Sequence, residues 1–116
     1  MVILEEAAWR NVINLSERCT RKRVDLSFSS ADSSVIWSGE AGKRHYIKFV
    51  SLYVDADVEF GFKWTLENVK YPLRLTQGYY IANLVGANMV GPVNDSLEIY
   101  AEGACNIKGF IIGQLK

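Results

Sequence analysis

Three carboxylates at alternate positions, Asp55, Asp57 and Glu59, are the residues of this chain best placed for site chemistry. Side chains at alternate positions of an extended segment point to one side, so the three could hold a calcium ion at a loop. A calcium loop also needs a glycine and a further acidic residue at set distances, and neither follows here. We therefore favour a turn whose two Asp side chains bond to their own backbone, with Glu59 pointing outward from a strand.

Other reactive residues are sparse. As a glycosidase pair the same carboxylates are weak candidates, because nothing in the sequence marks one as an acid with a raised pKa. His45 is the single histidine, and a metal site needs several convergent ligands, so we interpret it as structural or surface. No nucleophile motif and no phosphate-binding loop is present. We expect a protein that is not an enzyme and that uses no cofactor.

Aromatic side chains offer a different chemistry, since six Tyr and three Trp could stack on sugars. Trp64 is excluded because alternation assigns it to a buried row, whereas Tyr79, Tyr80 and Tyr100 are expected to be exposed. The favoured alternative is ordinary packing in the core and between subunits. The candidates for an interface or a ligand site are Trp9, Tyr79, Tyr80, Met89 and Tyr100.

Composition restricts the partners. The 116 residues are 49% hydrophobic, and 13 basic residues balance 13 acidic ones. A protein that binds nucleic acid through its phosphates normally shows a basic excess, so we expect no nucleic acid, and near-neutral charge favours self-association. The basic cluster formed by Arg18, Arg21, Lys22 and Arg23 is read as a solvated connection rather than an anion contact.

Cysteine content and hydropathy indicate the compartment. Cys19 and Cys105 match no zinc or redox spacing, and two buried free thiols are favoured over one disulfide. The first residues do not resemble a signal peptide, and no apolar run reaches the roughly 18 residues of a membrane span. We expect synthesis in the cytoplasm and no membrane partner, with later assembly onto a virion surface left open.

The elements that must position these residues are strands. Residues 58–66 place apolar side chains at every second position, the pattern of a strand with one face in a core. We expect it to form a hairpin with residues 43–54, which carry a bulge near Phe49-Val50. Pro72 should lie on an edge strand or at a strand start, and the last strand should be central. The expected strands are 23–29, 34–38, 43–54, 57–66, 70–76, 78–84, 96–102 and 105–113.

The fold prediction follows from this count. Several short strands with Gly, Pro and Asn turns and no helices between them indicate a sandwich or barrel. We predict one all-β domain over residues 1–116, an eight-stranded antiparallel jelly-roll β-sandwich at 23–113. Residues 1–20 are expected to add a short N-terminal helix, centred on 3–19, or an extended arm. The irregular stretch 86–95 is partly apolar and should pack on something.

The last third of the chain carries a resemblance. Gly78-Tyr-Tyr-Ile, Ser96-Leu-Glu-Ile-Tyr and Ile107-Lys-Gly-Phe-Ile-Ile resemble the closing strands of small jelly-roll subunits. Such subunits occur in viral capsids, phage decoration proteins and tumour-necrosis-factor-like trimers. The resemblance is architectural and implies a structural or interaction protein that works as a homo-oligomer, with a trimer expected. The alternative is a carbohydrate-binding module that uses exposed aromatics and calcium.

Overall fold

The computed structural model describes residues 19–84 and 89–116, and this part of the chain is built from strands. The described residues form no helix, and therefore none long and apolar enough to cross a membrane. The predicted helix or arm at 3–19, with Trp9, lies outside the described residues apart from Cys19. The nine strands are β1 (Thr20–Phe28), β2 (Asp32–Trp37), β3 (His45–Val54), β4 (Phe60–Trp64), β5 (Val69–Arg74), β6 (Gly78–Asn83), β7 (Met89–Val90), β8 (Leu97–Ala101) and β9 (Cys105–Leu115).

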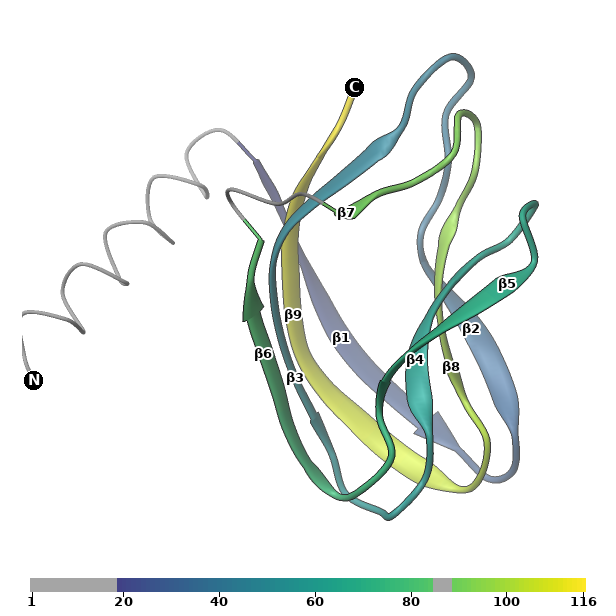
Figure 1. Cartoon of the computed structure of the whole chain (residues 1–116), viewed down its shortest axis with the longest axis vertical. Helices are drawn as coiled ribbons and strands as arrows, with labels where there is room; N and C mark the ends of the chain where they lie inside the picture. The colour runs from purple at the N-terminus through teal and green to yellow at the C-terminus, as the bar shows by residue number, and fades with distance from the viewer. Residues whose placement is uncertain (1–18, 85–88) are drawn as a thin grey trace, which may run out of the picture.

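The strands form two antiparallel sheets that face each other (Figure 1). The first sheet has the order β1-β9-β3-β6, and the short strand β7 also pairs with β3. The second sheet has the order β2-β8-β4-β5. The chain therefore passes between sheets after β1, β2, β3, β5, β7 and β8, which is the double Greek-key path of a jelly roll. The predicted fold class is confirmed, with β7 as an addition inside the stretch expected to be irregular.

The predicted hairpin between residues 43–54 and 57–66 is wrong. β3 lies in the first sheet and β4 in the second, so the turn between them is a corner that changes sheets. Asp55 holds this corner, because its carboxylate accepts hydrogen bonds of 2.7 Å from the backbone and side-chain amides of Asn106. Period-two alternation shows which face of a strand is buried. Two strands that face the same core from opposite sheets have the same alternation as two strands paired in a hairpin, so the pattern does not distinguish the two arrangements.

The last strand, β9, is central in the first sheet, as predicted. β9 pairs with β1 on one side and β3 on the other. The register of β3 against β9 shifts between Ile47 and Phe49, so the bulge falls where it was expected. As a result Ile47 and Val50 both enter the core, and Phe49 turns to the outer face together with its register partner Ile112.

The second sheet supplies the bulkiest core row. Phe60, Phe62 and Trp64 of β4 are all buried, as the alternation predicts. Leu66 departs from the pattern, because it lies beyond the end of the strand and is 71% exposed. Pro72 lies in β5, the edge strand of this sheet, where its missing N–H breaks no central ladder.

Candidate functional site

The three carboxylates at 55, 57 and 59 bind three different partners. Asp55 holds Asn106, Asp57 accepts a 2.9 Å bond from the backbone N–H of Gln77, and Glu59 accepts a 2.8 Å bond from the hydroxyl of Tyr100. These partners are distant in sequence, rather than the local backbone that was expected. Within residues 19–84 and 89–116 no cluster of His, Cys, Asp and Glu could hold a metal ion. The hydrogen bonds from Asn106 lower the pKa of Asp55, which suits a carboxylate that ties a corner.

Tyr100 was expected to be exposed, and that prediction is wrong, because the residue is only 2% exposed. Its neighbours Ile99 and Ala101 pack in the core, so Tyr100 points to the outer face of the second sheet. There its register partner on β4 is Gly61, which has no side chain to compete for the space above the strand. The ring is further covered by Lys70, whose ammonium lies 5.1 Å from the ring centroid.

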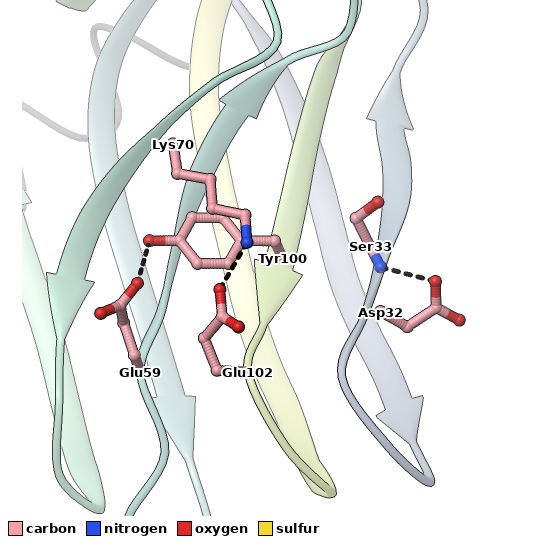
Figure 2. Close-up of polar contacts among 6 residues, drawn as sticks. All are labelled: Asp32, Ser33, Glu59, Lys70, Tyr100 and Glu102. Carbon is pink, nitrogen blue, oxygen red and sulfur yellow. Dashed lines mark hydrogen bonds and ion pairs between the residues drawn. The ribbon is translucent and has the colours of Figure 1, made fainter.

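Tyr100 is one of the residues that line a small polar pocket of about 220 Å³. Figure 2 shows the hydroxyl of Tyr100 donating to Glu59, while Lys70 reaches across the ring to Glu102 at 2.6 Å. Burial raises the pKa of the Tyr100 phenol, and the bond to Glu59 raises it further. With the ring covered and these charges paired, the pocket offers neither a stacking surface for a sugar nor a poised acid.

The outer face of the first sheet differs in character. Register places apolar and aromatic side chains from three strands side by side there, with basic residues of β1 along one margin. Tyr79 and Ile81 of β6 are 65% and 61% exposed, the highest values for large apolar residues within any described strand. We call this surface the aromatic face; its members are Arg21, Arg23, Phe49, Tyr53, Tyr79, Ile81 and Phe110. Ile112 lies on the same side of the sheet by register but is fully buried.

Ring contacts order the aromatic face. Phe49 and Phe110 stack with centroids 5.9 Å apart, and Tyr53 and Tyr79 tilt against each other at 4.8 Å. The guanidinium of Arg21 lies 4.4 Å from the centroid of Phe110, a cation–π contact. Aromatic–aromatic and aromatic–Arg pairs lose little side-chain freedom on binding, so the face is preorganised for contact.

A shallow groove of about 540 Å³ follows the basic margin of this face. Arg21, Arg23 and Lys108 line it, and Asp25 is the acidic residue among them. Arg23 approaches Asp25 at 3.6 Å, and both side chains are largely exposed, so this pair contributes little to stability. Arg21 and Arg23 are exposed, as the prediction of a solvated segment implies, and they lie in β1 beside the apolar residues of this face.

The remaining aromatic candidates are divided between surface and core. Tyr79 is exposed as predicted, whereas Tyr80 faces inward and packs half-buried against the core, so its predicted exposure is wrong. Met89 is also half-buried against the core, beside a hollow of about 330 Å³ that Trp64 and Tyr71 help to line. Among the candidates within the described residues, the Tyr79 ring is the most exposed.

Sequence reasoning missed Asp95, and it left His45 as either structural or surface. His45 is fully buried, and neither ring nitrogen has a hydrogen-bond partner. Asp95 is fully buried as well, and its carboxylate accepts bonds from the backbone N–H groups of Leu66, Glu67 and Ser96. The signal for Asp95 was the Asn-Asp-Ser turn before β8. For Ile81 the signal was its spacing of two residues from Tyr79, which places both side chains on the same face of the strand.

No protein-family model, curated protein or solved structure matches the chain. Of the resemblance to small jelly-roll subunits, the structure shows the strand order alone.

Proposed function

We propose that this protein is a non-enzymatic interaction protein and that it acts as a homo-oligomer whose second copy covers the aromatic face. The observation that carries the proposal is the exposure of Tyr79 and Ile81, 65% and 61%, on the outer surface of a regular sheet. Burying a large apolar side chain contributes about 1.5–3 kcal/mol. Leaving two of them in water next to further aromatic rings is typical of an interaction surface.

A second copy is the partner that the composition of the face suits. Protein interfaces are enriched in aromatic residues and Arg and have charged groups at the rim. The rim here carries both signs, because Asp25 and Lys108 are register partners on β1 and β9. The chain as a whole has no net charge, so two copies approach each other without long-range repulsion.

We extend the proposal to a trimer, made in the cytoplasm and placed on a virus or phage particle as a capsid or decoration component. Only the jelly-roll strand order supports this extension. The same strand order serves many unrelated functions, so the oligomer is the part of the proposal to test first.

The test is sedimentation equilibrium at micromolar concentration with two matched variants. Ile81→Lys puts a charge in the middle of the aromatic face, and we expect it to shift an oligomeric wild type toward monomer with an unchanged circular dichroism spectrum. Leu66→Lys is the control, because Leu66 is 71% exposed but lies in the β4–β5 turn of the second sheet. A monomeric wild type, or equal dissociation by both variants, would overturn the proposal.

The alternative, a carbohydrate-binding module, keeps one supporting observation: the exposed ring of Tyr79, held against Tyr53. Sugar rings stack on such surfaces. A glycan array probed with and without calcium separates the two functions. Glycan binding that is lost in Tyr79→Ala, from a protein that sediments as a monomer, would favour the module; silence on the array would remove it.

A further inference from the structure

His45, the first residue of β3, is enclosed by two indole rings at one end of the sandwich. Its ring centroid lies 4.6 Å from that of Trp37 and 6.0 Å from that of Trp64. The residue has no exposed surface, and both ring nitrogens lack a partner with hydrogen-bonding geometry. Buried polar atoms are almost always paired, so an imidazole left unpaired costs stability and calls for a physical reason.

The groups around the ring determine its charge. Burial is the main influence and lowers the pKa of His45 below its ordinary value of 6.5. The Ser38 backbone is close enough to the ring to favour its charged form, although it does not meet hydrogen-bonding geometry. It acts in the opposite direction to burial, as do the carboxylates of Asp95 and Glu40, while Lys22 adds to the lowering. Asp95 is poorly placed to neutralise an imidazolium, because both of its oxygens already accept backbone N–H groups. Burial in the closed structure therefore disfavours the charged imidazole.

The chain segments beside His45 form a strap, which we define as residues 91–96 bonded to residues 39–45. Gly91 N–H donates to the His45 carbonyl at 2.9 Å, and Asn94 N–H donates to the Lys43 carbonyl at 2.9 Å. The side chain of Asn94 accepts from Gly42 N–H at 2.6 Å, and the hydroxyl of Ser96 accepts from Gly39 N–H at 2.8 Å. The bond between Gly42 and Asn94 is exposed, and Val93 and Asn94 are exposed residues, which is typical of a segment that opens locally.

The strap lies against the indole of Trp64. A Cβ atom added at Gly91 of the strap would lie 2.5 Å from the Trp64 ring, whereas Trp37 meets Gly113 of β9, where an added Cβ would lie 3.1 Å from its ring. The imidazole of His45 contacts both indoles. Water can reach the ring nitrogens only when this packing loosens.

We propose that His45 is an acid sensor: uptake of one proton by its imidazole opens the strap and exposes the indole of Trp64. In the open form the ring is in water and titrates near 6.5, whereas in the closed form it resists protonation. The open form therefore binds more protons, and the ratio of open to closed molecules rises as the pH falls below about 6.5. One proton allows at most about a tenfold rise for each pH unit, ending when the closed form is also protonated. The inference does not depend on the proposed oligomer.

The wild-type experiment is amide hydrogen exchange read residue by residue at pH 7.5 and pH 5.0, with exchange rates corrected for the intrinsic effect of pH. We expect the protection of Gly91 and Asn94, two donors of the strap, to fall severalfold at pH 5.0. The amides of Phe62 and Ile99 in the second sheet serve as internal controls and should keep their protection. Because His45 is the single histidine, no other imidazole can account for a change in this range.

The variant His45→Phe keeps a flat ring between the indoles and removes the titratable nitrogens. We expect its strap protection and its tryptophan fluorescence to be the same at pH 7.5 and 5.0, whereas wild-type fluorescence changes. If the variant does not fold, the wild-type exchange pattern still decides. Unchanged protection in the wild type, equal loss in His45→Phe, or loss that includes Phe62 and Ile99 would each overturn the proposal.

Discussion

The hydroxyl of Tyr100 is buried with a hydrogen-bond acceptor, whereas the ring nitrogens of His45 are buried without one. At the scale of the residue this difference separates a structural role from a sensing one. A satisfied polar group resists change, because removing its partner leaves a desolvated atom behind. An unsatisfied group that can take up a proton gains from exposure to water, and the gain depends on pH.

Replacing Tyr100 with Phe tests the first role. The half-buried carboxylate of Glu59 would lose its 2.8 Å donor, and a hydrogen bond to a charged acceptor is worth about 1.5–3 kcal/mol. We expect the free energy of unfolding in urea to fall by that amount, with an unchanged m-value. Tyr79→Phe is the control and should stay within about 0.5 kcal/mol, since the Tyr79 ring is exposed. Equal losses in both variants would mean that the hydroxyl of Tyr100 contributes nothing specific.

At the scale of the element, β9 is the strand on which the first sheet depends. It lies between β1 and β3 along most of its length, and its residues Ile107 and Ile111 enter the core. Gly109 allows the close approach of β3: it has φ +147°, and a Cβ there would lie 1.9 Å from the backbone oxygen of Ser51. No side chain fits that space without separating the two strands.

Two glycine variants separate backbone conformation from this contact. Gly42 also has positive φ, +75°, but a Cβ there would meet nothing within 4 Å. Gly42→Ala should therefore cost only the conformational penalty, about 1–2 kcal/mol. Gly109→Ala adds a backbone clash, so we expect a loss of at least about 3 kcal/mol in chemical denaturation. Similar losses for the two variants would show that the β3–β9 contact is not limiting.

At the scale of the whole molecule, both sheets pack on one core, and the two free cysteines differ in how far they are buried. Cys105 is buried and belongs to the core cluster, whereas Cys19 is half-buried just before β1. Burial raises the pKa of the Cys105 thiol, and the charge of Asp55 raises it further. Since the thiolate is the reactive form, Cys105 should react only when the sandwich opens.

A thiol-reactive dye at pH 7.5 tests this difference. We expect two kinetic phases of equal amplitude, the fast one from Cys19 and a slow one from Cys105 that accelerates with urea. Cys19→Ser should abolish the fast phase and leave the slow phase unchanged. Fast reaction of both thiols in the absence of urea would show that the sandwich opens far more readily than its core packing indicates.

Several features of this fold could be predicted because they depend on neighbouring residues along the chain. The alternation at 58–66 identified the buried row of β4, since successive side chains of a strand point to opposite faces. The change of face within residues 43–54 located the bulge, and Pro72 located an edge strand. Each of these signals is contained in fewer than about ten residues, the usual length of a strand.

The sequence by itself determined that this protein is a sandwich of short strands and which faces of those strands are apolar. The tertiary structure decided which strands pair, so that β3 and β4 lie in opposite sheets. It also decided that Tyr100 is covered by Lys70 above Gly61 and that His45 lies between two indoles. These outcomes depend on contacts between residues far apart in the chain. Alternation cannot predict them, because it shows which face of a strand a side chain is on and not which residues pack against it.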